Sequence, residues 1–178
     1  MRLVLDFDGT VTERDTLDLV LERFGDAAIY ERVEHELDAG RMTLNEVIAA
    51  EFQTVTAPLD EVVGWLLENA RIRPGFAELA REGVLEAVEL RANRVDPRPD
   101  GWVVDFRVGD ACGACGEPCK RADLPDGEVV YAGDGHSDYC AALAADRVFA
   151  TGSLARWLRE RGVAFTPLTD FRALASEL

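Results

Sequence analysis

The chain has 178 residues and a formal net charge of −15, a length at which one or two domains can each bury a core. The negative charge repels phosphate backbones, so nucleic acid is not an expected partner. No apolar run approaches the 18 residues or so of a membrane span, which excludes a membrane protein of that kind. No export signal precedes the first acidic residues, and we therefore expect a cytoplasmic protein.

The first predicted element is a buried strand that ends in two carboxylates. Leu3, Val4 and Leu5 are continuously apolar, and Asp6 and Asp8 follow immediately. A strand buried on both faces has this composition, and the carboxyl edge of an open α/β sheet is where ligands bind. Two carboxylates this close need a cation, or one must keep its proton. A hard cation with oxygen ligands, such as Mg²⁺, suits them.

The next segment predicts four helices, which together would form an insert over residues 13–72. A capping box at Thr43 and Glu46 opens the third helix. The apolar positions are Leu17, Val20, Leu21 and Phe24, then Ile29, Val33 and Leu37, then Val47, Ile48, Phe52 and Val55, and finally Leu59, Val62, Val63, Leu66 and Leu67 on one face.

The remaining chain alternates between predicted strands and helices. A short helix follows the break at Pro74 and Gly75, and residues 88–91 and 102–106 read as a β-hairpin. Further strands are expected at 128–133, 147–150 and 163–165, with helices at 140–145 and 154–161. This alternation predicts an α/β fold, with a parallel sheet, a helical insert and a small hairpin.

A second set of charged residues comes late in the chain. Lys120 is the single lysine beside 18 arginines, which suggests a position that needs a compact point charge. Asp134 and Asp138 follow the buried strand at 128–133. If the strands are parallel, both aspartate pairs reach the same edge of the sheet, and Lys120 lies close by.

This constellation resembles the haloacid dehalogenase superfamily, in particular its phosphatases with a helical cap after the first motif. Residues 6–10 (Asp-Phe-Asp-Gly-Thr) match the first motif of that family, Lys120 matches the third, and residues 133–138 match the fourth. The branch that it resembles contains phosphoserine phosphatase and the methylthiopentenyl-phosphate phosphatases. The resemblance implies a Rossmann-like core over 1–12 and 73–178 and a helical cap over 13–72.

The resemblance also implies a role for each motif residue. Asp6 would attack phosphorus and form an aspartyl-phosphate, and Asp8 would act first as general acid and then as general base. Lys120 would hold both Asp6 and a phosphate oxygen. Gly9 and Thr10 would supply backbone N–H groups to the phosphate.

The same resemblance implies a Mg²⁺ site. Its ligands would come from Asp6, the carbonyl oxygen of Asp8, and Asp134. Asp138 would complete the metal site by orienting the water shell of the ion, or would orient Lys120. The expected activity is hydrolysis of a small phosphorylated metabolite, and the sequence identifies neither that metabolite nor the oligomeric state.

One motif of this family is missing from the sequence. The second motif is a Ser or Thr at the end of the second sheet strand, yet residues 80–84 run directly toward the hairpin and no Ser precedes Ser137. About 20 residues are absent, roughly a strand and a helix. Either that segment is disordered and omitted, or the chain lacks it. Since a true deletion would expose an edge of the first strand, we expect an omitted segment.

Two further functions remain open from the sequence. A genuine lack of the second motif would favour a catalytically silent protein that binds phosphate esters. A phospho-accepting signalling domain also uses an aspartate cluster, a lysine and Mg²⁺, although the insert after the first strand argues against it. Separately, Cys112, Cys115 and Cys119 have a spacing that fits zinc, and Cys140 could be a fourth ligand.

Overall fold

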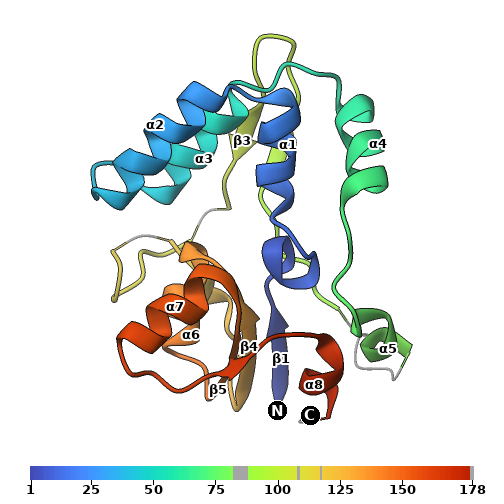
Figure 1. Cartoon of the computed structure of the whole chain (residues 1–178). Coiled ribbons are helices and arrows are strands. Elements are labelled where there is room, and N and C mark those ends of the chain that lie inside the picture. The colour runs from blue at the N-terminus through green and yellow to red at the C-terminus, as the bar shows by residue number, and fades with distance from the viewer. Residues whose placement is uncertain (82–87, 108, 117, 177–178) are drawn as a thin grey trace. The chain divides into compact units, whose positions relative to one another are not determined.

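The computed structural model describes residues 1–81, 88–107, 109–116 and 118–176 (Figure 1). Its contacts divide the chain into two compact units, each with its own hydrophobic core. The first unit comprises Met1–Asp15, Arg71–Glu89 and Val108–Leu178, and the second comprises Thr16–Ala70 and Leu90–Arg107. The hairpin segment, which the sequence analysis grouped with the core, therefore falls in the helical unit.

The first unit is built on a four-stranded parallel sheet with the order β1-β4-β5-β6. Its strands are β1 (Arg2–Leu5), β4 (Val129–Gly133), β5 (Arg147–Ala150) and β6 (Thr166–Pro167). Its helices are α5 (Phe76–Arg81), α6 (Tyr139–Ala142), α7 (Gly152–Glu160) and α8 (Phe171–Ala175). The predicted parallel α/β core is confirmed.

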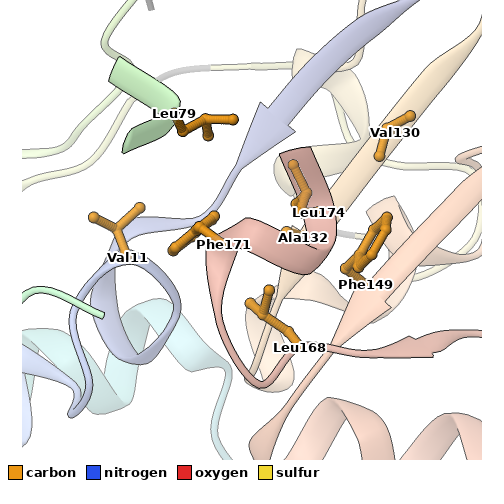
Figure 2. Packing of buried hydrophobic residues seen from close by; sticks show 8 residues of the cluster. All are labelled: Val11, Leu79, Val130, Ala132, Phe149, Leu168, Phe171 and Leu174. Atoms are coloured by element: carbon orange, nitrogen blue, oxygen red, sulfur yellow. The ribbon is translucent and has the colours of Figure 1, made fainter. Parts of the chain in front are cut away.

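Helices cover both faces of this sheet, and β4 is therefore buried along its whole length. Val130 and Ala132 point to one face, where they pack with side chains of α5 and α8 (Figure 2). Tyr131 points to the other face and packs against α6 and α7. Alternation along one strand thus supplies apolar side chains to two separate clusters. Full burial of each large side chain contributes about 1.5–3 kcal/mol.

Strand β1 lies at the edge of the sheet. It pairs in parallel with β4, in the register that sets Leu5 opposite Ala132, and no other described strand pairs with it. Leu3 and Leu5 pack against the cluster that includes side chains of α5 and α8. Residues 82–84, part of the region that lacks the second motif, lie outside the described residues.

The continuous sequence corrects the expectation of an omitted segment. All 178 residues belong to one chain, and no described strand lies beyond β1 in the sheet. Helices α5 and α8 contact each other, and in Figure 1 α8 lies beside β1 on the side away from β4. The exposed-edge argument failed because β1 is an edge strand among the described residues, with Leu3 and Leu5 packed against the apolar cluster that includes side chains of α5 and α8.

The second unit contains four helices and the hairpin. The helices are α1 (Thr16–Phe24), α2 (Ala27–Asp38), α3 (Leu44–Phe52) and α4 (Leu59–Asn69), as the sequence predicted. The predicted capping box is present at the start of α3, where Thr43 and Glu46 each accept the backbone N–H of the other. On α4, Val62 is buried but Leu59, Val63 and Leu67 are exposed, so the predicted apolar face is only partly buried.

The hairpin consists of β2 (Arg94–Asp96) and β3 (Val103–Asp105). Its first strand was predicted at 88–91, and this placement is wrong. The pairing partner is fixed by Trp102, whose N–H donates to the carbonyls of Phe52 and Val55 and whose indole donates to Ala57 O at 2.9 Å. The first strand of the hairpin therefore ends close to the turn, as β2 does at Asp96.

None of the described helices has the length and apolar character needed to cross a membrane.

Candidate active site

The carboxyl ends of β1 and β4 bring two aspartates to the same edge of the sheet. The N–H of Asp6 donates to Ala132 O at 2.9 Å, which extends the strand pairing to the first carboxylate. Asp134 follows Gly133, the last residue of β4. The start of α7 fixes Asp134, because its carbonyl oxygen accepts the N–H of Leu154 at 2.7 Å. Residues 128 positions apart in sequence thereby face one another.

The segment η1 (Phe7–Val11) that follows Asp6 requires a glycine. Gly9 has φ +71, and a Cβ at this position would lie 2.7 Å from Cγ of Asp134. Both the backbone conformation and the close approach exclude other side chains. Thr10 completes the contact by donating from Oγ1 to Asp134 Oδ1 at 3.2 Å. The first and fourth motifs are therefore in direct contact through Gly9 and Thr10.

Lys120 connects the two ends of this site. It lies at the start of the short helical turn η2 (Lys120–Asp123), and its Nζ donates to Asp6 Oδ1 and, at 2.7 Å, to Asp138 Oδ1. The Lys120 side chain is 34% exposed, whereas those of Asp6 and Asp138 are 12% and 0% exposed. A compact ammonium with three donors can bridge two carboxylates in this way, as predicted for the single lysine.

Asp138, in the turn η3 (His136–Asp138), is fully buried and accepts hydrogen bonds on both oxygens. Oδ1 accepts from Lys120 and from the Tyr131 hydroxyl, each at 2.7 Å. Oδ2 accepts the N–H groups of Asp134 at 2.8 Å and Gly135 at 2.9 Å. Because these four donors use most of its acceptor capacity, Asp138 organises the loop and the lysine.

The carboxylates repel one another in this partly buried setting. Burial, and then the charges of Asp6 and Asp138, raise the pKa of Asp134 to about 8. Burial and the charge of Asp138 also raise the pKa of Asp6, against the opposing effect of Lys120. Burial acts to lower the pKa of Lys120, but the charges of Asp6 and Asp138 outweigh it and raise that pKa. The site carries an excess of negative charge.

The curated relatives that match this chain are phosphatases. No protein-family model matches it, but the 2-hydroxy-3-keto-5-methylthiopentenyl-1-phosphate phosphatase of Bacillus cereus (strain B4264) is 26% identical over 211 residues, which cover 100% of this chain and 95% of that protein. A homologue of the same name from Bacillus anthracis (strain CDC 684 / NRRL 3495) is also 26% identical over the same coverage. With the motif residues in direct contact, these relatives match the expected resemblance to phosphatases of the haloacid dehalogenase superfamily. The chain is a phosphoric monoester hydrolase.

Solved structures of this superfamily share the fold. A substrate-bound phosphoserine phosphatase matches with a TM-score of 0.66 at 15% identity, over 99% of this chain and 97% of that chain. A haloacid dehalogenase family hydrolase from Salmonella enterica matches with a TM-score of 0.67 at 12% identity, over 97% of this chain and 69% of that one. These likenesses extend over the whole length of the chain.

The alignment with the Bacillus cereus phosphatase also bears on the missing motif. It spans 211 positions, of which this chain can fill 178, so at least 33 positions have no counterpart in this chain. The difference exceeds the 20 residues or so expected from the absent strand and helix.

The donor set fits a hard divalent cation. Carboxylate oxygens of Asp6, Asp134 and Asp138 all lie within 4.8 Å of one another, and their mutual repulsion is what such an ion relieves. Asp8 enters the predicted metal site through its carbonyl oxygen, and its carboxylate is not part of this group. The N–H of Gly9 donates to Thr12 Oγ1 at 3.0 Å, so the phosphate contact expected of Gly9 stays a prediction.

Two residues that hold the site were not found from the sequence. Arg73 donates from its guanidinium to the carbonyl oxygens of Gly9 at 2.6 Å, Thr10 at 2.7 Å and Thr12 at 3.4 Å. These hydrogen bonds stabilise the loop over residues 9–12 that follows Asp6. Tyr131, the other, has the same sequence setting as the apolar residues of its buried strand. Arg73 stands beside the break at Pro74, but one arginine among 18 carries no signal of its own.

Proposed function

We propose that this phosphatase is Mg²⁺-dependent and hydrolyses a small phosphorylated metabolite through an aspartyl-phosphate on Asp6. The observation that carries the proposal is the position of Lys120 between Asp6 and Asp138, with Asp134 beside them. A nucleophilic carboxylate, a point cation and an acidic metal site within one cluster supply what a phosphate monoester needs: attack, charge neutralisation and orientation.

Asp6 is the proposed nucleophile. Its Oδ1 accepts the Lys120 hydrogen bond, which leaves Oδ2 to attack phosphorus and form the new P–O bond as the bond to the leaving oxygen breaks. Lys120 keeps Asp6 ionised and in place, and it offers a donor to a phosphoryl oxygen. The intermediate divides one slow hydrolysis into two faster steps.

Asp8 is the proposed general acid and base. It lies two residues after Asp6, in the segment η1, and is half-buried. It would give its proton to the leaving alcohol and then take a proton from the water that attacks the phosphoenzyme. Asp6 cannot fill both roles, because its oxygen is bonded to phosphorus during the second step.

For the metal site we propose Asp6, Asp134 and the carbonyl oxygen of Asp8 as ligands. Bound Mg²⁺ would neutralise charge on the phosphoryl oxygens and hold them in line for attack. Asp138 would act as a positioning residue, since its oxygens already accept from Lys120, Tyr131 and two backbone N–H groups. Thr10 would hold the Asp134 ligand through its hydroxyl.

The proposed cap is the predicted insert over residues 13–72, of which the helical unit contains 16–70, together with the hairpin over 90–107. A cap of this kind excludes water and selects the substrate. The curated relatives are named for 2-hydroxy-3-keto-5-methylthiopentenyl-1-phosphate, and a fold neighbour is phosphoserine phosphatase. We therefore propose a small, organic phosphate monoester as the substrate, with these two compounds as the first to be tried.

The test is release of p-nitrophenol from p-nitrophenyl phosphate, with Mg²⁺ or with EDTA. Wild-type protein should turn over only with Mg²⁺, and Asp6→Asn should lose turnover. The matched control, Asp126→Asn, changes an exposed aspartate outside the cluster and should keep full activity. Asp8→Asn should retain a phosphoryl group, seen by mass spectrometry on the peptide that contains Asp6.

Two results would contradict the proposal. Turnover that persists in Asp6→Asn would exclude Asp6 as the nucleophile. A folded wild-type protein that binds phosphate esters without hydrolysing any of them would be the silent binding protein, and would connect the loss of activity with the absent second motif.

A further inference from the structure

We propose that Cys112, Cys115, Cys119 and Cys140 form a structural zinc site. The Sγ atoms of these four cysteines all lie within 4.8 Å of one another, and none of the four is in a disulfide. They account for every cysteine in the chain. Their cluster is a different group of residues from the carboxylate cluster of the active site.

The first two cysteines lie on a turn shaped to present thiolates. The N–H of Ala114 donates to Cys112 Sγ at 3.4 Å, and the N–H of Gly116 donates to Cys112 O at 2.7 Å. Gly116 has φ +79, a conformation that a side chain would strain. Cys-Gly-Ala-Cys-Gly therefore folds into one tight turn in which backbone N–H groups point at sulfur.

This hydrogen bonding favours the charged form of the sulfur. The backbone N–H groups of Ala114 and Cys115 lower the pKa of Cys112 to about 6. Thiolate is the form that binds metal. The geometry of the cluster carries the proposal, and the environment of Cys112 agrees with it.

The other two cysteines come from separate elements. Cys119 immediately precedes Lys120 and η2, and Cys140 is the second residue of α6. These two elements are in contact within the first unit. The site is therefore assembled from a local pair, a third ligand four residues after it, and a fourth 21 residues later. Convergence of cysteines from separate elements is typical of a folded metal site.

Zinc fits this donor set better than other common metals. Four thiolates around zinc, with bonds near 2.3 Å, leave neighbouring sulfurs about 3.8 Å apart, a separation inside the 4.8 Å within which these four sulfurs lie. Mg²⁺ requires oxygen ligands and does not compete for this site. Four protein ligands leave no open position, which makes the site structural.

The loop that carries these cysteines has little else to hold it. Of the described residues in 109–116, only Cys112 is not exposed, and none belongs to a hydrophobic cluster. Binding a metal can supply the free energy that such a segment cannot gain by apolar burial. The loop ends at Cys119, next to the lysine of the active site, so the metal would also fix Lys120.

The zinc site would thus fix the positions of Lys120 and Asp138 through cysteines that are their near neighbours in sequence. Cys119 is adjacent to Lys120, and Cys140 lies two residues after Asp138. A metal that joins these two cysteines constrains both partners of the 2.7 Å hydrogen bond. The cysteines act here as positioning residues, since none of them belongs to the carboxylate cluster.

The first experiment is metal analysis of the full chain purified without chelators, followed by exchange into Co²⁺. We expect about one zinc per chain. The Co²⁺ form should show the visible bands of tetrahedral cobalt and the near-ultraviolet charge-transfer absorption of thiolate ligands. Neither readout requires phosphatase turnover, so failure of the proposed function would leave this test intact.

Variants of Cys115 distinguish a ligand from a packing residue, because this side chain is exposed and contributes little to the core. Cys115→Ala should reduce zinc affinity by more than about 100-fold, beyond the 10- to 100-fold that an outer partner of a ligand costs. Cys115→His should keep the metal with altered cobalt bands. Asp110→Asn, an exposed change in the same loop, should bind zinc as wild type does.

Three results would overturn the proposal. These are a metal-free protein that gives no cobalt spectrum, iron in place of zinc as the purified metal, and equal zinc content in wild type and Cys115→Ala. A metal-free protein with a Cys112–Cys115 disulfide would likewise refute the site and point to thiol oxidation instead.

Discussion

The hydroxyl of Tyr131 donates to Oδ1 of Asp138 over 2.7 Å, in a buried hydrogen bond beside the active-site carboxylates. Both residues are almost fully buried, and the same Asp138 oxygen accepts from Lys120. The strand β4 thus contributes to the site twice, through Asp134 after its end and through a tyrosine on its hidden face. The burial of Tyr131, followed by the charge of Asp138, raises the pKa of the phenol and keeps it a donor.

Tyr131→Phe is expected to lower kcat by about 10-fold. Asp138 Oδ1, which also accepts from Lys120, would lose the hydroxyl donor that fixes its position. The free energy of unfolding should fall by about 1–3 kcal/mol, the cost of an acceptor left short of a partner. Steady-state kinetics and urea unfolding measure the two effects. Tyr30→Phe removes a similar hydroxyl-to-aspartate bond in the helical unit and serves as the control.

If Tyr30→Phe and Tyr131→Phe lowered kcat equally, the buried bond would have no special connection to catalysis.

Lys120→Arg should leave the protein folded but reduce kcat by about 100-fold or more. The single nitrogen of the lysine ammonium donates to an oxygen of Asp6 and to an oxygen of Asp138. The larger, planar guanidinium of arginine cannot take the place of this compact group. Lys120→Met should be worse for stability, by about 2 kcal/mol, because two carboxylates lose their cation. We set this below the 3–5 kcal/mol of fully buried pairs because Lys120 is 34% exposed.

An arginine variant with wild-type kcat would show that charge alone, without its compact geometry, suffices at this position.

The stability of the metal-free protein should decrease as pH rises between about 4 and 8. Asp134 keeps its proton in the folded state up to its pKa of about 8, whereas the unfolded chain releases it near 3.8. The folded state therefore binds more protons in this window, and its advantage is lost as the pH rises. Urea midpoints at pH 5 and pH 8 in EDTA measure the slope.

Asp134→Asn should flatten this slope without abolishing it, since the pKa values of Asp6 and Glu34 are also raised by burial. Mg²⁺ at pH 8 should restore stability to wild type only. An unchanged slope in Asp134→Asn would refute the assignment of the titration to this residue.

Arg73→Met should lower the free energy of unfolding by about 2–3 kcal/mol and should impair catalysis. Its guanidinium is bound to three carbonyl oxygens of the loop that follows Asp6, and charged hydrogen bonds of this kind are worth about 1.5–3 kcal/mol. Arg172→Met is the control, because Arg172 forms an exposed ion pair with Glu78 at 3.1 Å and should cost less than about 1 kcal/mol.

Equal losses in the two arginine variants would mean that the loop does not depend on Arg73.

The sequence was sufficient for the parallel core and for the residues that converge at its edge. Periodicity predicted α1 to α4, and the buried strands at 129–133 and 147–150 were found because continuous apolar runs between turns have few alternatives. Asp6, Lys120, Asp134 and Asp138 were chosen by motif order. The structure gathers all four, although their chemical roles stay predictions.

The failures have a common physical cause, which is long-range packing. The hairpin register depends on Trp102 and its contacts with Phe52 and Val55, which no local pattern reveals. The exposed residues of α4 follow the same apolar spacing as its buried Val62. The loop-binding role of Arg73 depends on carbonyl oxygens more than 60 residues away in sequence.

Strand β1 has a consequence for the dynamics of the enzyme. The N–H groups of Arg2 and Asp6 donate to β4, whereas parallel geometry turns those of Leu3 and Leu5 to the opposite side. Amide hydrogen exchange should therefore alternate along this strand, with slow sites at even positions and fast sites at odd ones. Asp6, the proposed nucleophile, follows a strand that pairs with β4 alone among the described strands, so its carboxylate belongs to a part of the sheet that can open locally while the rest stays folded.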